Sequence, residues 1–244
     1  MEQAPSRRLA LLIDGDNAQP GLIEAMLAEA SKYGLVTIRR IYGDWTKPEM
    51  KGWKDSLHHH AIQPIQQFRY TTGKNSTDSA LIIGAMDTLY EGSVQGFCIV
   101  SSDSDYTRLA TRIPEKGLFV MGIGEEKTPK AFVNACEIFV FVENLLGDAA
   151  ISAAPRKRRV DAQASQPDPL PLLKRAVEIT MDDSGWAFLG AVGTALRQLD
   201  PSFDPRSFGY RQLSQLVKSQ SANFEIREKT GQGGSSSVYV KPKE

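Results

Sequence analysis

The chain of 244 residues carries 29 Lys+Arg and 29 Asp+Glu, and 41% of its residues are hydrophobic. This composition indicates a globular protein with one or two cores and excludes disordered and fibrous proteins. No apolar run is long enough to span a membrane, and the first eight residues lack a secretory pattern, so we expect a cytoplasmic protein. Cys98 and Cys136 have neither metal-ligand spacing nor the density of a disulfide scaffold, which predicts buried, reduced thiols.

The first predicted elements alternate strands with helices. Residues 8–13 form a continuous apolar run, typical of a strand buried on both faces, and the polar loop Asp14–Asn17 follows it. Pro20 opens a helix, and residues 36–42 form the second strand. Residues 61–68 predict a weaker strand, because the proline within it suits an edge position.

The same alternation continues to about residue 142. A helix begins at the polar residues Ser76–Asp78, and residues 97–100 form a buried strand that ends in the acidic loop Ser101–Asp105. Two further strands are predicted over residues 118–123 and 137–142. Strands separated by helices predict an α/β fold of three layers, in which a mainly parallel sheet lies between two layers of helices.

A change of composition divides the chain into two domains. Residues 150–167 are rich in Ala, Ser and Pro and include the basic run Arg156–Arg159, so we predict a flexible basic linker between a domain at 1–149 and a domain at 168–244. The second domain has three predicted helices and two short strands that flank a Gly/Ser-rich tip. This order predicts a small winged-helix domain, with its elements at 170–179, 186–196, 208–217, 224–227 and 238–240.

Acidic residues recur at the ends of predicted strands in the first domain. Asp14 and Asp16 follow the first strand, Asp103 and Asp105 follow a later one, and Asp78 lies at a helix start. Because the carboxyl ends of parallel strands meet at one edge of a sheet, these carboxylates are expected to converge. Their mutual repulsion favours a divalent cation, so the pattern predicts metal-assisted chemistry. The alternative interpretation is that each aspartate only caps a helix.

Three segments, Leu12–Asn17, Lys74–Leu81 and Val100–Tyr106, resemble the NYN domain, a group of PIN-like ribonucleases related to LabA. The resemblance extends over roughly residues 7–146, and the chain lacks the glycine that many members have before the middle aspartate. It implies four catalytic carboxylates that also hold Mg²⁺ or Mn²⁺: Asp14, Asp78, Asp103 and Asp105. It further implies secondary roles for Asp16 and Asn17, and Lys74 is a candidate phosphate contact.

A second resemblance covers the C-terminal domain, where Phe203–Val217 is similar to the LOTUS domain, also called OST-HTH. This resemblance implies binding of single-stranded, structured or G-rich RNA, or of a protein partner such as a helicase. Arg206, Arg211 and Lys218 are the candidate RNA contacts, because they place positive charge along the third predicted helix.

These observations predict a metal-dependent ribonuclease, an endonuclease on single-stranded RNA that leaves 5′-phosphate and 3′-hydroxyl ends, with RNA targeting by the LOTUS domain. One alternative is a non-catalytic RNA-binding adaptor with a vestigial metal site. Another is a phosphatase of the haloacid dehalogenase type, suggested by Asp14-Gly15-Asp16, although Asn17 stands where that motif needs Thr or Val. No membrane partner is expected, and a homodimer is compatible with the fold although no sequence feature requires one.

Overall fold

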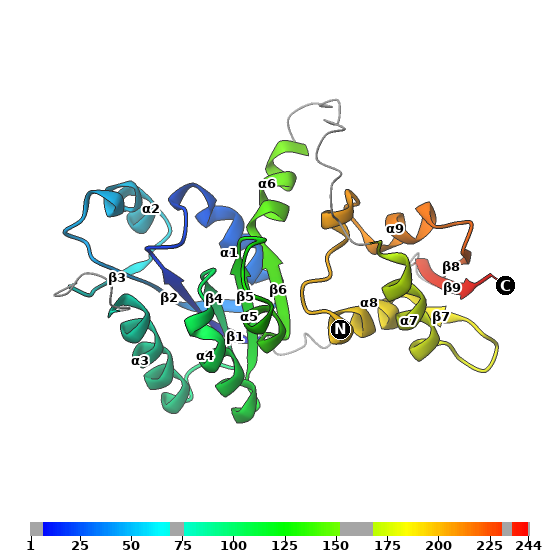
Figure 1. Ribbon diagram of the computed structural model, residues 1–244, viewed down its shortest axis with the longest axis horizontal. Helices are drawn as coiled ribbons and strands as arrows, with labels where there is room; N and C mark the ends of the chain where they lie inside the picture. The colour runs from blue at the N-terminus through cyan, green and yellow to red at the C-terminus, as the bar shows by residue number, and fades with distance from the viewer. Residues whose placement is uncertain (1–6, 69–75, 152–167, 231–235, 244) are drawn as a thin grey trace. The chain divides into compact units, whose positions relative to one another are not determined.

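The computed structural model describes residues 7–68, 76–151, 168–230 and 236–243 (Figure 1). The chain divides into two compact units, residues 1–149 and 150–244. Within the described ranges, none of the helices combines the length and the apolarity needed to cross a membrane.

The first unit is built on a six-stranded sheet of order β3-β2-β1-β4-β5-β6, in which every neighbouring pair is parallel. The chain starts in the middle with β1, moves outward to β3 and then returns to β4 on the other side. The carboxyl ends of β1 and β4 therefore flank the position where a doubly wound sheet binds its ligands. The strands are β1 Arg8–Asp14, β2 Leu35–Gly43, β3 Gln63–Gln66, β4 Gly96–Val100, β5 Phe119–Gly124 and β6 Ile138–Phe141.

Helices cover both faces of this sheet (Figure 1). The α-helices are α1 Ile23–Ser31, α2 Lys54–His59, α3 Ser76–Glu91, α4 Thr107–Arg112, α5 Lys130–Ala135 and α6 Val142–Ile151. Short 3₁₀ turns lie at η1 Pro20–Leu22, η2 Pro48–Trp53, η3 Ser104–Tyr106 and η4 Pro114–Lys116. The three-layer α/β prediction is therefore confirmed.

Alternation along β1 explains why the sheet has a core on each face. Leu9, Leu11 and Ile13 pack into one hydrophobic cluster, together with residues of α1 and α6. Ala10 and Leu12 point the other way into a second cluster, with residues of α3, α4 and α5. A strand that is apolar on both faces requires this arrangement, because successive side chains point to opposite sides of the sheet.

The two thiols are free and buried, as predicted. Cys98 lies on β4, and Cys136 follows α5. Burial raises the pKa of Cys136 to about 12 and also raises the pKa of Cys98. Both thiols therefore remain protonated and act as small apolar core residues.

In its described residues, the second unit has three α-helices, a 3₁₀ turn and a three-stranded antiparallel sheet of order β7-β9-β8. It has a hydrophobic core of its own, formed by side chains from all three α-helices and all three strands. This is the predicted winged-helix architecture. Its elements are α7 Leu170–Thr180, β7 Ala187–Phe188, α8 Leu189–Leu199, η6 Pro205–Phe208, α9 Leu213–Ser219, β8 Phe224–Thr230 and β9 Ser236–Pro242.

Two helix boundaries in this unit differ from the sequence-based expectation. The second helix begins at Leu189, because Ala187 and Phe188 pair with β9 instead of joining the helix. The third α-helix begins at Leu213, because Phe208 ends a separate turn at Gly209, whose φ of 82° lies in the left-handed region.

The predicted linker is described only at its start. Helix α6 continues to Ile151, two residues into the stretch assigned to the linker. Residues 152–167, including the basic run Arg156–Arg159, lie outside the described residues, as does the Gly/Ser-rich tip at 231–235.

Candidate active site

Asp14 ends the central strand β1, and it is completely buried. Its Oδ2 accepts hydrogen bonds from Asn17 Nδ2 at 2.6 Å and from Ser101 Oγ at 3.0 Å, while its Oδ1 accepts one from the backbone N–H of Asp16 at 3.1 Å. Burial raises the pKa of Asp14, and these hydrogen bonds oppose that shift because they favour the ionised form. The carboxylate is therefore desolvated and tightly oriented.

Ser101 connects the two central strand ends. It follows β4 directly and is buried, and its hydroxyl donates to Asp14 while accepting the backbone N–H of Asp103 at 3.1 Å. Its own backbone N–H donates to the carbonyl of Ile123 on β5 at 3.0 Å. No role was predicted for Ser101 from the sequence. Its position, a small hydroxyl residue directly after a buried central strand, indicates a residue of the site.

Three of the predicted carboxylates form a cluster. Asp78, Asp103 and Asp105 each offer one oxygen, and these three oxygens all lie within 4.8 Å of one another. Asp78 belongs to the first turn of α3, while Asp103 caps the 3₁₀ turn η3 by accepting the backbone N–H of Asp105 at 2.9 Å. Asp78 and Asp103 are half-buried and Asp105 is exposed, so one side of this acidic cluster faces solvent.

Tyr106 donates a hydrogen bond to the acidic cluster from the protein interior. Its side chain is completely buried, and its hydroxyl donates to Asp78 Oδ1 at 2.8 Å. Burial, followed by the negative charges of Asp14 and Asp78, raises the pKa of Tyr106, so it remains a neutral donor. Tyr106 stood in a recognised motif, but the sequence did not reveal where its hydroxyl would point.

The pKa of Asp78 is raised both by burial and by neighbouring carboxylates. Burial raises it most, the hydrogen bond from Tyr106 lowers it, and the charges of Asp14, Asp103 and Asp105 raise it further. Asp14 is thus electrostatically coupled to the acidic cluster although it is not one of its three members. Uncompensated negative charge of this kind is neutralised well by a divalent cation with oxygen ligands.

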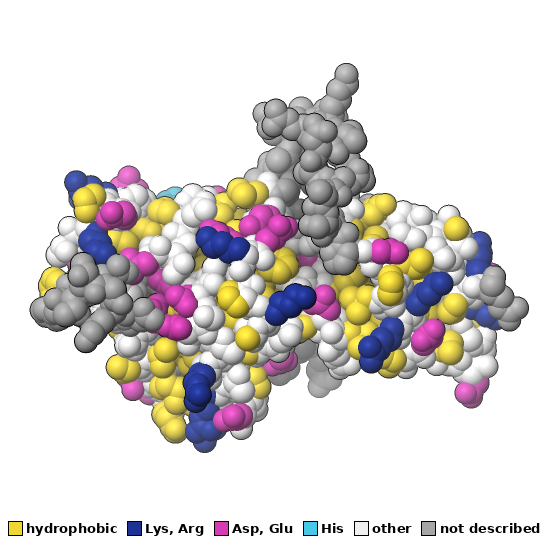
Figure 2. Space-filling model, viewed as in Figure 1, with side chains coloured by type: hydrophobic (Ala, Val, Ile, Leu, Met, Phe, Trp, Pro, Cys, Tyr) yellow, Lys and Arg dark blue, Asp and Glu magenta, His cyan; other side chains and the backbone are white. Residues whose placement is uncertain are grey.

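The remaining predicted residues of the first unit differ in their placement. Asn17 and Asp16 are exposed, and both contribute to fixing Asp14, Asn17 through its side-chain amide and Asp16 through its backbone. In Figure 2, acidic side chains gather on the visible face between the start of α3 and β4. Lys74 lies outside the described residues.

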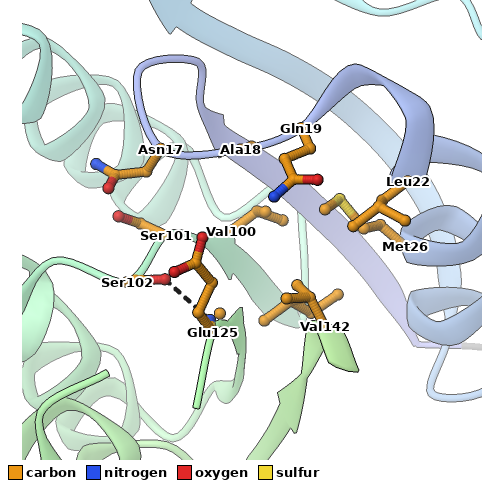
Figure 3. A pocket seen from close by; sticks show the side chains of 12 residues that line it. Asn17, Ala18, Gln19, Leu22, Met26, Val100, Ser101, Ser102, Glu125 and Val142 are labelled. Carbon is orange, nitrogen blue, oxygen red and sulfur yellow. Dashed lines mark hydrogen bonds between the residues drawn. The ribbon is translucent and has the colours of Figure 1, made fainter. Parts of the chain in front are cut away.

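A small hollow adjoins the buried side of this region (Figure 3). Asn17, Ser101, Ser102 and Glu125 contribute to its rim, and the Ser102 hydroxyl accepts the backbone N–H of Glu125 at 2.9 Å. Its volume of about 10 Å³ is water-sized. A nucleotide does not fit in this hollow.

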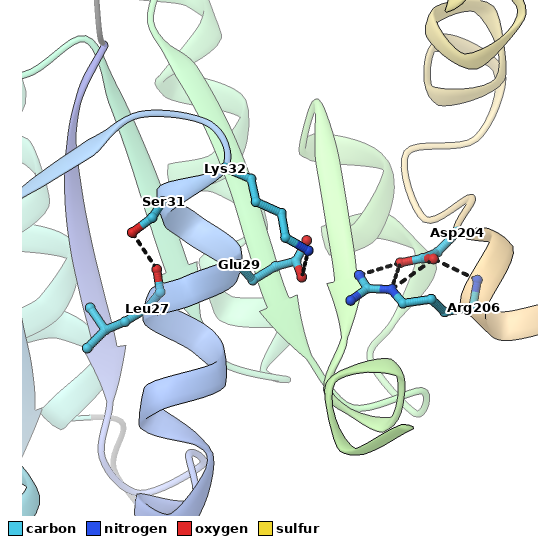
Figure 4. A network of polar contacts seen from close by, with 6 residues as sticks. All are labelled: Leu27, Glu29, Ser31, Lys32, Asp204 and Arg206. Carbon is cyan, nitrogen blue, oxygen red and sulfur yellow. Dashed lines mark hydrogen bonds and ion pairs between the residues drawn. The ribbon is translucent and has the colours of Figure 1, made fainter. Parts of the chain in front are cut away.

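The predicted RNA contacts of the second unit are engaged to different degrees. The guanidinium of Arg206 donates from Nε to both carboxylate oxygens of Asp204 and from Nη2 to Oδ2 at 2.6 Å, and both side chains are more than four-fifths buried (Figure 4). Lys218 pairs with Glu228 at 2.6 Å on the surface. Arg211 is exposed, and its backbone N–H donates to Gln215 Oε1 at 3.0 Å.

A parallel sheet with acidic residues beyond its central strands, followed in the chain by a small winged helix, is the architecture expected of a PIN-like domain with a LOTUS domain. The chain belongs to the NYN domain family, whose model matches residues 8–144, more than half of the chain. The OST-HTH/LOTUS domain matches residues 164–235. Both resemblances proposed from the sequence are therefore confirmed.

Two solved structures are similar to parts of the chain. A protein of unknown function from Vibrio parahaemolyticus shares 16% identity with a TM-score of 0.49, covering 58% of this chain and 96% of that one. An uncharacterised protein from Nitrosomonas europaea shares 33% identity with a TM-score of 0.31, covering 38% of this chain and 89% of that one. No curated protein matches the chain.

Proposed function

We propose that the NYN unit is a metal-dependent endoribonuclease that hydrolyses single-stranded RNA to 5′-phosphate and 3′-hydroxyl ends. The acidic cluster of Asp78, Asp103 and Asp105 carries this proposal, because three carboxylate oxygens within 4.8 Å of one another could together hold a metal ion, beyond the cap that Asp103 provides for η3. Asp14 adds a buried negative charge beside them.

The donor set suits Mg²⁺ or Mn²⁺. Both ions prefer carboxylate oxygen, and burial, followed by the charges of Asp14, Asp103 and Asp105, raises the pKa of Asp78. Asp78, Asp103 and Asp105 would hold the ion, and Asp14 would support it electrostatically. A divalent cation at this position supplies Lewis acidity, which activates water as a nucleophile and stabilises charge that develops on the phosphate.

The protein's own groups prepare the site for that chemistry. Tyr106 holds one oxygen of Asp78, and the turn at η3 holds one oxygen of Asp103, so both carboxylates are oriented before substrate binds. Hydrogen bonds from Ser101 and Asn17 favour the ionised form of Asp14 and oppose the rise in its pKa that burial causes. The RNA backbone approaches from the exposed side, where Asp105 lies.

The nucleophile in this proposal is water, because a divalent cation held by carboxylates activates bound water at neutral pH. Attack by water, with departure of the 3′ oxygen, leaves the proposed 5′-phosphate and 3′-hydroxyl ends.

The phosphatase alternative fits the geometry poorly. It needs Asp14 as a nucleophile that reaches the substrate phosphorus. Asp14 has no exposed surface, and its two oxygens already accept three hydrogen bonds. We therefore retain Asp14 as a supporting carboxylate of a nuclease.

The deciding experiment incubates the purified full-length chain with end-labelled single-stranded RNA in Mn²⁺, Mg²⁺ or chelator, and identifies the ends of the products. Asp103→Asn is compared with Asp87→Asn, which changes an exposed aspartate of α3 outside the acidic cluster. We expect cleavage only with metal, lost in Asp103→Asn and kept in Asp87→Asn. Undiminished cleavage by Asp103→Asn would contradict the site, and intact RNA that is nevertheless bound would support the adaptor alternative.

A further inference from the structure

The sheet of the second unit has one face in the core and one face outside. Ala187, Phe224 and Val240 are essentially fully buried against the helices. The residues next to them in each strand point to the opposite side, because side chains alternate along a strand. The register places Phe188 and Arg227 directly opposite Tyr239 on its two flanking strands, so these three side chains share the outer face.

Aromatic rings and cations are interleaved on this outer face. The ring centroids of Phe188 and Tyr239 lie 5.7 Å apart, and Phe188 is 47% exposed. Lys229 Nζ lies 4.9 Å from the centre of the Tyr239 ring, and the Arg227 guanidinium lies 4.2 Å from the centre of the Trp186 ring. We call these five residues, Trp186, Phe188, Arg227, Lys229 and Tyr239, the wing platform.

Local packing holds the exposed ring of Phe188 in place. A side chain at Gly190, the second residue of α8, would meet the Phe188 ring at 2.6 Å, so the ring lies against the bare backbone of the helix start. The contact with Tyr239 supports the ring on its other side. An exposed aromatic ring that is already ordered loses little conformational entropy when it binds a flat partner.

We propose that the wing platform binds single-stranded RNA, with bases stacking on Phe188 and Tyr239 and phosphates meeting Arg227 and Lys229. The proposal rests on the RNA substrate of the proposed function and adds the surface that captures it. Stacking of this kind requires bases that are free of a duplex, and it tolerates different sequences because every base has a flat face.

The charges on this face complement a nucleic-acid backbone. Among the described outward-facing residues of β8 and β9, three are cations and one is an acid, namely Arg227, Lys229, Lys241 and Glu225. Each cation over a ring retains N–H donors for phosphate, and Arg227 presents a planar group suited to paired contacts. An apolar protein partner would make no favourable electrostatic contact with these cations.

The helix expected from the sequence is less suited to RNA. The charge of Arg206 is directed to Asp204, and Lys218 is paired with Glu228. Of the three predicted contacts, only Arg211 combines exposure with no such acidic pairing in the described structure. On the sheet, Lys241 lies opposite Glu225 and Lys229 interacts electrostatically with Asp182, so the exposed aromatic rings together with Arg227 favour the sheet over the helix.

The test measures fluorescence anisotropy of a labelled oligo(U) of about 12 nucleotides with the full-length chain in EDTA, at several salt concentrations. Phe188→Ala should weaken binding about fivefold or more at every salt concentration, because a stacking contact is lost. Arg227→Ala should also weaken binding and reduce the slope of log K against log salt by about 0.7, because one phosphate contact is lost.

Matched controls separate the platform from general surface effects. Lys174→Ala removes an exposed cation of α7, and Ile179→Ala removes an apolar side chain of the same helix that is 59% exposed. Both should bind oligo(U) within about twofold of the wild type. Phe188→Leu keeps an apolar side chain but removes the ring, so it should weaken RNA binding while melting like the wild type.

Several outcomes would overturn the proposal: equal affinity for a blunt RNA duplex, wild-type binding by Phe188→Ala and Phe188→Leu, or a larger loss in Arg211→Ala than in Arg227→Ala. The proposed nuclease is judged separately, because these assays contain no metal. Metal-dependent cleavage combined with platform-independent binding would defeat this inference alone. Platform-dependent binding without any cleavage would defeat the proposed function alone.

Discussion

The two units of this protein present their polar chemistry in opposite ways. In the NYN unit, carboxylates are drawn into a half-buried cluster and oriented by buried donors such as Tyr106 and Ser101. In the LOTUS unit, aromatic rings and cations lie on the outside of a sheet, in contact mainly with one another. Holding like charges close together requires buried hydrogen-bond donors that orient the carboxylates. A binding surface requires only that suitable side chains lie on the exposed face of a sheet.

This contrast separates two kinds of variant. Changes in the acidic cluster should abolish chemistry and leave RNA affinity intact, whereas changes on the wing platform should lower affinity by graded steps and leave chemistry intact at saturating RNA.

The largest effect is expected for Asp78→Asn. Loss of one carboxylate from the acidic cluster should reduce single-turnover cleavage in Mn²⁺ by at least about 100-fold, because charge stabilisation at the phosphate is lost. RNA affinity in EDTA should stay within about twofold of the wild type. A loss of RNA affinity that accompanied the loss of cleavage would contradict the assignment of cleavage and RNA binding to different units. Asp87→Asn provides the matched control on the same helix.

Tyr106→Phe should have the next largest effect. It removes only the hydroxyl that donates to Asp78, so the carboxylate loses its orientation while the ring still fills the core. The Mn²⁺ concentration for half-maximal cleavage should rise about tenfold or more. The Mn²⁺-induced increase in melting temperature should shrink as well, whereas Tyr90→Phe, at an exposed position of α3, should leave both quantities unchanged.

Removal of residues 168–244 should have a smaller effect that depends on substrate length. The NYN unit keeps both of its hydrophobic clusters, so we expect it to remain folded. Affinity for long RNA should fall about tenfold, because two linked contacts become one, and metal-dependent cleavage of a short oligonucleotide should persist. Unchanged affinity in a mobility-shift assay would show that the LOTUS unit does not deliver RNA.

The smallest effect concerns pH and the turn before the wing platform. Asp182 accepts hydrogen bonds from the Ser184 hydroxyl at 2.6 Å and from the Trp186 backbone N–H at 3.1 Å, and these contacts lower its pKa below 3.8. Because the pKa of Asp182 is lower in the folded state than in the unfolded state, its charge stabilises the fold at every pH above the unfolded-state pKa. This stabilisation is lost as the pH falls through the folded-state pKa.

The melting temperature should therefore distinguish wild type from Asp182→Asn at neutral pH, and the difference should fade below about pH 4. Asp183→Asn is the control on the adjacent exposed aspartate. A difference that stays constant from neutral to acid pH would show that the charge of Asp182 does not order the turn that carries Trp186.

Local patterns in the sequence were enough to predict the fold class of the first unit and the edge of the sheet where its acidic residues lie. Continuous apolar runs predicted strands buried on both faces, and the alternation with helices predicted the parallel sheet. Acids directly after two buried strands, and Asp78 at a helix start, were predicted to converge because parallel strands end at one edge. Three of them, Asp78, Asp103 and Asp105, form the acidic cluster. These features depend on residues that are close together in the chain, so the periodicity of apolar residues and the residue types in turns are enough to predict them.

Only the tertiary structure decided how distant residues are paired. The sequence did not show that Asp204 would neutralise Arg206, that the Tyr106 hydroxyl would point to Asp78, or that Phe188 would leave the predicted helix for a strand. The outer face of the wing joins residues some 50 positions apart, and its composition depends on the register of β7, β8 and β9. A shift of one residue would exchange that face for the buried one, so the register, set by packing of the core, determines which side chains are available for RNA.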